Sequence, residues 1–510
     1  MLNKPRHAEL RRKIIDLQPS VIVVEDAEGV AAIEQVLESL ELHDLVRVSL
    51  SDKPISSNSG SWLPLADLCS PVSDQAASAR LDDARYDSPD RDALIVYTSG
   101  TSSGIPKGCI RHVRGWIQSV SRTIWSLPGD TRGKRALQTT NFRVIAPGCA
   151  VRAWYDGATV VLTGRTFDPM KFLDAMEQEG MSELVLLPAQ LHAVAATPGF
   201  ELRDKSSVKL IMSGGDIVTS SLIEQSKRLF PEAGFMTAWG MSEAGGVGRA
   251  EGRNTTTSVD GVSQFAGKAV RSASKHHPDR RLAGLSALIQ QSRDVLTHSN
   301  VVFAWPYWDG IKSIPFYSGI SPLGRVSSGS RVRLMSADGK VVERGEFGEI
   351  HIQSNSVFKS YLAAPEKMDV VYTDQEGRWF KTGDLGMIND AGDVYIVGRL
   401  KDVIKRAAIS IAPAAIESCL AAFTGSQTAV VGRPHPTLGQ EPFAILQSFN
   451  GKSEADLSAH VIATYGPDWV LGGAIELKAL GLDTFPLNPT GKIQKLDLLE
   501  ALAKSSAVTS

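Results

Sequence analysis

Cysteine is scarce in this chain of 510 residues, and its few cysteines do not pair. Cys69, Cys109, Cys149 and Cys419 lie far apart, without the spacing that zinc sites or dithiol redox motifs use. We therefore expect structural thiols in a reducing compartment. The N-terminus also lacks the apolar core of a signal peptide, so the sequence predicts a cytoplasmic protein.

Long apolar runs and an excess of one charge are missing too. No run approaches the roughly 18 residues that a membrane span needs. The 54 Lys and Arg residues balance 56 Asp and Glu residues, which gives a net charge of −2. This balance argues against partners such as nucleic acid or an anionic membrane surface. With 43% hydrophobic residues the composition is that of a globular protein, and the length predicts two or three domains.

Apolar strands alternate with amphipathic helices over much of the chain. Segments 93–98, 182–188 and 208–215 read as buried strands that end in turns. Segments 168–180 and 220–234 predict helices closed by glycine. This alternation predicts an α/β fold in which ligands bind at the carboxyl ends of the strands.

The pattern changes in the second half of the chain. Residues 250–318 are polar, with one predicted helix at 279–296, and we interpret them as an insertion or lid. Residues 330–354 predict a β-hairpin with an Asp-Gly turn. After about residue 400 strands and helices alternate again, which predicts a small C-terminal domain.

The stretch "LIVYTSGTSSGIPKG", residues 94–108, places glycines and hydroxyls directly behind a buried strand. Small residues let backbone N–H groups converge on an anion, and Ser and Thr hydroxyls add donors. A flexible linker would not follow a buried strand, so the stretch predicts a phosphate loop. It differs from the G-x-x-x-x-G-K-[ST] pattern because Gly108 follows Lys107. The nucleotide-binding residues predicted here are Thr98, Ser99, Gly100, Thr101, Ser102, Ser103, Gly104 and Lys107.

The loop resembles the signature of the acyl-adenylate-forming superfamily, which includes acyl-CoA synthetases, non-ribosomal adenylation domains and luciferases. Three further segments resemble motifs of that family in the same order. They are "TAWGMSEAGG" (237–246), "FKTGDLGMINDAGDVYIVGRLKDVIK" (380–405) and "PLNPTGKIQK" (486–495). The resemblance spans roughly residues 20 to 500 apart from the insertion.

The resemblance implies a domain organisation. It implies a large α/β N-terminal domain over residues 1–398, with parallel-rich sheets and a small β-barrel-like part. A hinge follows at 399–402 with its pivot at Lys401, and a small mobile α/β lid domain occupies 403–510. The phosphate loop begins after fewer residues than in most relatives, which implies either that part of the usual N-terminal subdomain is missing or that the start of the chain is truncated. The oligomeric state is not predicted.

The resemblance also implies a reaction, in which a carboxylate attacks the α-phosphate of ATP and expels pyrophosphate to leave acyl-AMP. Because two anions must meet, the site needs cations and a divalent metal. Glu243 and Thr101 are the expected Mg²⁺ ligands. Lys492 is expected to bridge the substrate carboxylate and the α-phosphate. Together these three are the predicted catalytic residues.

Other positions are assigned to the nucleotide and the acid by the same resemblance. Trp239 stands where the family has a tyrosine that stacks on adenine. Asp384 is expected to accept hydrogen bonds from the ribose hydroxyls, with Arg399 as a donor beside it. The remaining nucleotide-binding residues are Gly215, Gly240 and Ser242, and the predicted substrate-pocket residues are Arg143, Gly214 and Met241.

Two departures from the family pattern bear on the acid and the acceptor. Arg143 stands where amino-acid-activating relatives carry aspartate, and it would repel an ammonium group, so α-amino acids are poor candidates for the activated acid. Ala407 and Ala408 replace a Gly-Gly pair whose backbone lines the coenzyme A tunnel in relatives. Added methyl groups there could narrow that tunnel.

Three functions stay open at this point. The first is an acyl-CoA synthetase that uses ATP, Mg²⁺ and coenzyme A on a small-molecule carboxylic acid. The second is an adenylating enzyme that hands the acyl group to an amine or amino acid, as amide ligases similar to coronafacate ligase do. The third is a pseudoenzyme that binds a nucleotide or acyl-adenylate. The presence of Glu243, Asp384, Arg399 and Lys492 argues against the third.

Overall fold

The computed structural model describes most of the chain, and its described residues gather into two compact units. These units are Met1–Arg91 with Ser360–Pro365, and Asp92–Lys359 with Glu366–Ser510. The described residues are 7–40, 42, 45–57, 60–69, 73, 75–76, 78–80, 87–98, 106–116, 135–138, 150, 153–154, 157–164, 167–246, 303–305, 314–317, 319–326, 330–363, 368–407, 409–487 and 493–508.

The first unit is a four-stranded sheet with helices packed on one face. The sheet order is β1 (Val21–Val24), β2 (Val46–Ser49), β4 (Gly60–Pro64) and β3 (Ile55–Ser57). The first three of these strands run parallel, and β3 pairs antiparallel with β4. The helices of the unit are α1 (His7–Leu17), α2 (Ala27–Glu38) and the short α3 (Leu65–Leu68), and the two-residue strand β18 (Ser360–Tyr361) also belongs to it.

A buried polar group sits inside the apolar core of this unit. Trp62 is fully buried, and its Nε1 donates to Glu34 Oε1 at 2.7 Å. Arg47 Nε lies 3.5 Å from the same oxygen. The buried carboxylate is therefore paired, as burial of a charge requires.

The second unit is built around a mostly parallel sheet. Its order is β14 (Phe303–Trp305), β11 (Gly234–Ala238), β10 (Leu210–Gly214), β9 (Glu183–Leu186), β7 (Arg135–Gln138) and β8 (Thr159–Leu162). Only β14 at one edge is antiparallel to its neighbour. This order confirms the predicted α/β class.

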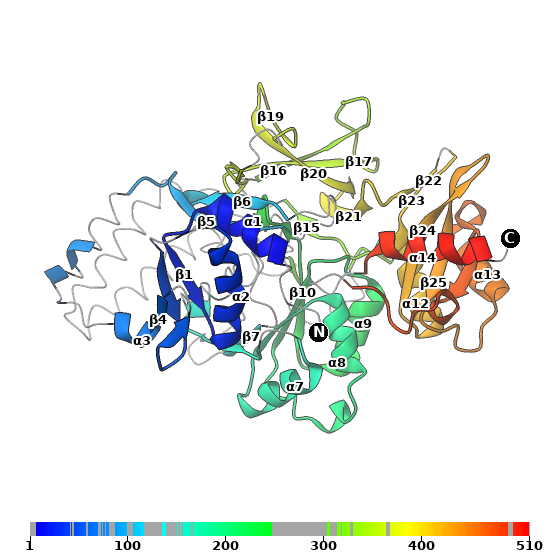
Figure 1. Ribbon diagram of the computed structural model, residues 1–510. Coiled ribbons are helices and arrows are strands. Elements are labelled where there is room, and N and C mark those ends of the chain that lie inside the picture. Colours follow the sequence, from blue (N-terminus) through cyan, green and yellow to red (C-terminus); the bar gives the residue numbers. More distant parts are fainter. Residues whose placement is uncertain are drawn as a thin grey trace, which may run out of the picture. The chain divides into compact units, whose positions relative to one another are not determined.

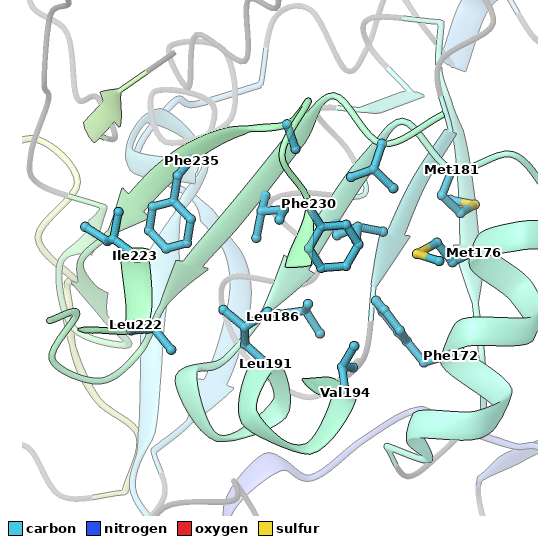
Figure 2. Packing of buried hydrophobic residues seen from close by; sticks show 14 of the residues in the cluster. Phe172, Met176, Met181, Leu186, Leu191, Val194, Leu222, Ile223, Phe230 and Phe235 are labelled. Carbon is cyan, nitrogen blue, oxygen red and sulfur yellow. The ribbon is translucent and has the colours of Figure 1, made fainter. Parts of the chain in front are cut away.

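Three helices cover one face of that sheet. They are α7 (Pro169–Gln178), α8 (Pro188–Ala195) and α9 (Ser220–Leu229). Helix α7 begins where predicted, because the Asp168 side chain accepts from the Met170 and Lys171 N–H groups. Figure 2 shows the apolar core between helices and sheet, with Phe172 and Met176 of α7 on one side of Phe230 and with Phe235 and Ile223 on the other.

Two short hairpins stand beside this sheet. Strand β5 (Asp92–Tyr97) pairs antiparallel with β6 (Gly108–His112), and β12 (Gly240–Met241) pairs antiparallel with β13 (Gly245–Gly246). The predicted phosphate loop connects the first pair. The motif at 237–246 forms the end of β11 and the whole of the second pair.

An antiparallel sheet follows, where the small β-rich part was expected (Figure 1). Its order is β15 (Gly324–Arg325), β21 (Asp393–Arg399), β20 (Gly377–Ile388), β17 (Phe347–Ser354) and β16 (Ser330–Met335), and β19 (Val371–Asp374) also pairs with β20. The predicted hairpin is confirmed by β16 and β17 with Gly339 at φ +81° in the turn.

The C-terminal part alternates strands and helices, as predicted. Its strands are β22 (Ile404–Arg406), β23 (Ile409–Ile411), β24 (Thr428–His435), β25 (Gly439–Leu446) and β26 (Ala474–Glu476). Its helices are α12 (Pro413–Thr424), α13 (Glu454–Tyr465) and α14 (Lys495–Val508). Short 3₁₀ turns occupy Phe200–Leu202 in the sheet region and Pro467–Trp469 and Leu477–Leu480 here.

Several predictions from the sequence stay predictions. The boundaries 1–398, 399–402 and 403–510 rest on the resemblance alone. Residues 250–302 of the expected insertion, with its helix at 279–296, lie outside the described residues, as does Cys149. The other three cysteines are free thiols. No helix in the described part of the chain is long and apolar enough to cross a membrane.

Candidate active site

The predicted phosphate loop is closed at its base by two hydrogen bonds. Tyr97 and Gly108 are paired in the β5–β6 register. Beyond them, Thr98 N donates to Lys107 O at 2.8 Å, and Lys107 N donates to Thr98 Oγ1 at 3.0 Å. Thr98 and Lys107 therefore hold the two ends of the loop together. Ser99, Gly100, Thr101, Ser102, Ser103 and Gly104 lie outside the described residues.

The turn that carries Glu243 is fixed through three consecutive carbonyl groups. Arg111 Nη1 donates to Ser242 O at 3.2 Å, Phe358 N donates to Glu243 O at 2.6 Å, and Ser356 Oγ donates to Ala244 O at 2.6 Å. The three donors come from two segments far from the turn in sequence. The Glu243 side chain stays partly exposed, so the turn presents its carboxylate from a rigid backbone.

Arg111 is a site residue that the sequence analysis missed. Its side chain is fully buried, and burial lowers the pKa of its guanidinium to about 10, although the nearby Cys109 and Glu243 act in the opposite direction. Cys109 is buried beside it, and burial followed by the charge of Glu243 raises the pKa of the thiol. Cys109 and Arg111 are both buried in β6, but no residue pattern in the sequence marks Arg111 as buried, because the apolar Ile110 is out of phase with it.

Three predicted residues meet at one carboxylate. Trp239 Nε1 donates to Asp384 Oδ2 at 3.2 Å, and Arg399 Nε lies 2.9 Å from Asp384 Oδ1. Asp384 is 3% exposed, whereas Arg399 is exposed at the end of β21. Trp239 and Asp384 are 145 residues apart in sequence, so the fold brings together what the motifs had assigned separately.

The backbone around Asp384 is shaped by its neighbours. Gly383 adopts φ +69°, a left-handed conformation that glycine accepts without strain. Asp384 N donates to Thr382 Oγ1 at 3.0 Å, and Arg399 Nη1 donates to Thr382 O at 3.0 Å. Arg399 therefore binds both the carboxylate of Asp384 and the backbone two residues earlier.

A second carboxylate, that of Glu349, accepts a hydrogen bond from the backbone of the turn at Gly383. Glu349 Oε1 accepts from Gly383 N at 3.1 Å, and its Oε2 lies 3.3 Å from His351 Nε2. His351 Nδ1 lies 2.6 Å from Tyr372 Oη. The hydrogen bond from His351 is the main cause of a lowered pKa at Glu349. Glu349 was not predicted, and no motif marks it.

The glycines expected near adenine lie beside Trp239. Gly214 pairs in register with Ala238 on the neighbouring parallel strand, so Gly215 and Trp239 follow at the carboxyl ends of β10 and β11. Gly215 adopts φ +80°, and a Cβ there would lie 2.9 Å from Leu187 Cδ2. Glycine is therefore favoured at position 215, chiefly because of the positive φ. Met241, predicted for the substrate pocket, is partly exposed in β12.

Apart from Lys401, the remaining predicted residues lie outside the described ranges or next to one of the gaps between them. Arg143, Lys492 and Ala408 lie outside the described residues. Leu487 and Ile493, on either side of the lysine loop, form an isolated antiparallel bridge. Lys401 lies in an exposed turn between β21 and β22, which is compatible with a pivot.

Of the two expected Mg²⁺ ligands, Thr101 lies outside the described residues, and Glu243 fits a magnesium ion that also binds phosphate. Mg²⁺ keeps several waters and is usually held by one or two carboxylates together with substrate phosphates. Glu243 supplies one partly exposed carboxylate on a fixed turn, and no group of three or more potential ligands gathers among the described residues. Such a donor set suits a metal that arrives with a nucleotide.

Comparison with known proteins decides the family. The family model for AMP-binding enzymes matches residues 4–274, more than half of the chain. The chain belongs to the AMP-binding enzyme family. An acyl-CoA ligase of Pestalotiopsis microspora is 32% identical over 96% of this chain and 74% of the ligase. The predicted membership of the adenylate-forming superfamily is thereby confirmed.

Solved structures of this family share the fold. An anthranilate CoA ligase, AuaEII, in complex with anthranoyl-AMP superposes with a TM-score of 0.71 and 19% identity, covering 99% of this chain and 83% of that one. The amide bond synthetase McbA of Marinactinospora thermotolerans gives a TM-score of 0.68 and 20% identity, covering 97% and 82%. At these identities the likeness shows the fold alone.

Proposed function

We propose that the protein is an ATP-dependent carboxylic acid ligase that forms acyl-AMP and then passes the acyl group to coenzyme A. The observation that carries this proposal is the meeting of Trp239, Asp384 and Arg399 at one carboxylate in a member of the AMP-binding enzyme family. The 32% identity to an acyl-CoA ligase over nearly the whole chain supports the thioester as the product.

In the first step a carboxylate oxygen of the acid attacks the α-phosphorus of ATP. The bond between the α-phosphorus and the bridging oxygen breaks, and pyrophosphate leaves with its electrons. Asp384 accepts hydrogen bonds from the ribose, and Lys492 brings a positive charge to the two anions that meet. A magnesium ion bound at Glu243 and Thr101 would offset the charge of the leaving group. Backbone donors of residues 98–104 would hold the phosphates.

In the second step the thiol sulfur of coenzyme A attacks the acyl carbonyl carbon. The thiol proton passes to solvent, the acyl–phosphate bond breaks, and AMP leaves. We propose that the C-terminal part turns about Lys401 between the two steps, so that the lysine loop leaves the site before the thiol enters. The exposed turn between β21 and β22 supports this position for the pivot.

A specific observation favours a second candidate, in which an amine takes the acyl group. Ala407 adopts φ +52°, and its N–H donates to Leu438 O at 2.7 Å. An L-residue is strained in this conformation, which glycine adopts freely. Ala407 thus adopts a conformation that a glycine would adopt without strain, and it adds a methyl group there. The fold shared with an amide bond synthetase is compatible with this alternative.

One experiment separates the candidates. The full chain is incubated with ATP, Mg²⁺ and a panel of carboxylic acids, and acyl-AMP is detected by mass spectrometry. Coenzyme A and a set of amines are then offered separately. A thioester supports the leading proposal, and an amide supports the second candidate. Binding of an acyl-adenylate without its formation from any acid would indicate the pseudoenzyme.

The proposed location and partners of the protein rest on its cysteines and its net charge. We propose a cytoplasmic location because the described cysteines Cys69, Cys109 and Cys419 are all free thiols. The net charge of −2 supports small-molecule partners rather than nucleic acid. An acid without an α-ammonium group remains our proposed substrate class, because Arg143 carries the same charge as that group.

A further inference from the structure

Trp239 presents two chemically different parts to the site. Its ring faces are apolar π surfaces, whereas its N–H lies in the ring plane and donates at the edge. In this structure the edge is engaged, because Nε1 donates to Asp384 Oδ2 at 3.2 Å. A bond in the ring plane does not cover a ring face, so the same side chain can stack on a base.

Each oxygen of the Asp384 carboxylate has an N–H group of another side chain beside it. Arg399 Nε lies 2.9 Å from Oδ1, and the indole donates to Oδ2. The torsion that turns a carboxylate about its Cβ–Cγ bond is otherwise broad. Two donors on different oxygens therefore restrict the plane of the carboxylate, and loss of either donor removes part of that restraint.

The two donors differ in how firmly they are placed. Arg399 has a side chain that is 47% exposed and sits one residue before the turn that contains Lys401. Trp239 follows directly on the buried strand β11 and precedes the turn whose carbonyls are bound by Arg111, Phe358 and Ser356. The indole is thus the more rigid of the two.

We propose that the indole N–H of Trp239 sets the specificity for ribose over deoxyribose by orienting the carboxylate of Asp384. This inference rests on the proposed role of Asp384 as the acceptor for the ribose hydroxyls. Trp239 acts here as a positioning residue. Phenylalanine has no donor, and tyrosine carries its hydroxyl at the tip of the six-membered ring rather than at the position of the indole N–H, so neither would fill this role in the same way.

The test measures the affinity of the full chain for ATP, 2′-deoxy-ATP and 3′-deoxy-ATP by isothermal titration calorimetry. A site that hydrogen-bonds a hydroxyl rejects the analogue without it. For at least one of the two deoxy nucleotides, we therefore expect the wild-type dissociation constant to be at least about tenfold higher than that for ATP. In Trp239→Phe the ring face is kept and the N–H is lost. We expect the ratio of the dissociation constant for that deoxy nucleotide to the one for ATP to fall about fivefold. ATP should bind more weakly, whereas the affinity for the deoxy nucleotide should change little.

The chain offers a matched control. Trp379 is 1% exposed, and its Nε1 donates to Asp374 Oδ1 at 3.1 Å. Trp379→Phe removes the same indole–aspartate bond at a different place, so it should leave the ribose ratio unchanged. Trp239→Tyr serves as a second variant if the phenylalanine protein does not fold, and the same fall in the ratio is expected for it.

Each outcome decides between the claims. An unchanged ratio in Trp239→Phe, or an equal loss of affinity for all three nucleotides, would overturn the inference and leave Asp384 as the ribose acceptor. A wild-type protein that binds all three nucleotides equally would remove the role of Asp384 itself and the inference with it. The ligase function is tested separately, by acyl-AMP formation with ATP in the same preparations.

Discussion

Arg111 Nη1 donates to the carbonyl oxygen of Ser242 at 3.2 Å across 131 residues of sequence. The guanidinium is fully buried, and it lies beneath the turn that carries Glu243. A buried cation is costly unless it is paired, so its presence here indicates that the turn depends on it. The link joins the strand that leaves the phosphate loop to the proposed metal ligand.

The first prediction concerns this link. Arg111→Leu removes the donor that fixes the Ser242 carbonyl, which loosens the turn that carries Glu243. We therefore expect the half-saturating Mg²⁺ concentration for acyl-AMP formation to rise about tenfold, which corresponds to ~1.4 kcal/mol. The stability should change less, because apolar side chains often replace buried ions without loss. Arg111→Lys keeps an N–H donor for the Ser242 carbonyl and should show a smaller rise. An unaltered Mg²⁺ requirement in the leucine variant would leave Arg111 with a packing role only.

The second prediction concerns acid stability. The hydrogen bond from His351 keeps the pKa of Glu349 below its ordinary value, although burial acts in the opposite direction. A carboxyl whose pKa is lower in the folded protein stabilises the fold above the unfolded pKa and loses that contribution as the pH falls through the folded pKa. Urea unfolding should therefore show that Glu349→Gln loses less stability than wild type below about pH 4.5. Glu232→Gln, at an exposed position, is the control. Parallel pH curves for wild type and Glu349→Gln would contradict the prediction.

The third prediction concerns backbone strain at Ala407. Its φ of +52° costs an L-residue about 1 kcal/mol, so Ala407→Gly should raise the free energy of unfolding by roughly 0.5 kcal/mol after the added chain entropy. The same change at Ala422, exposed in α12, should lower it by about 1 kcal/mol. Chemical denaturation measures both. Destabilisation of equal size at the two sites would show that Ala407 is not strained.

The fourth prediction concerns the lysine loop. Removing one charged donor from a preorganised site costs about 10²–10³ in rate, so Lys492→Ala should nearly abolish acyl-AMP formation. Lys495, three residues later, pairs with Glu417 at 2.7 Å, and Lys495→Ala should keep the activity. Pyrophosphate release measures both variants. Wild-type release from Lys492→Ala would take the residue out of the mechanism.

The fifth prediction concerns the pivot. Lys401→Pro should leave acyl-AMP formation intact and slow the transfer to the acceptor, because proline removes backbone rotation at that residue. Lys401→Ala keeps the rotation and should support both steps. Apolar residues on both sides of the turn, including Leu385 and Ala415, pack in one cluster that a rotation must rearrange. Equal impairment of the two steps would place the pivot elsewhere.

The regular elements followed closely from local sequence. Asp168 and Pro169 marked the start of α7 because capping depends on neighbouring residues only. The Asp338-Gly339 turn predicted the β16–β17 hairpin for the same reason. Helix α9 ends at Leu229, earlier than the predicted glycine at 234, because the chain turns at Phe230 before it enters β11.

The site was less predictable from the residues alone. Trp239 and Asp384 could be assigned to one nucleotide only through the family resemblance, since no spacing rule connects positions 145 residues apart. Arg111 lies in "IRHVRG", a basic stretch that suggests a solvated surface, and its burial arises from packing against a distant turn. Glu349 gains its role only because β17 lies beside β20 in the sheet.

Asp384 and Arg399 are register partners on β20 and β21, and the chain leaves β21 directly into the exposed turn at Lys401. The ribose of a nucleotide bound at Asp384 would therefore lie close to the axis of the proposed rotation at Lys401, where displacement is smallest. If the C-terminal part turns about Lys401 as proposed, an adenylate bound at Asp384 would move little during the rotation. The intermediate could then stay bound between the two steps of the reaction.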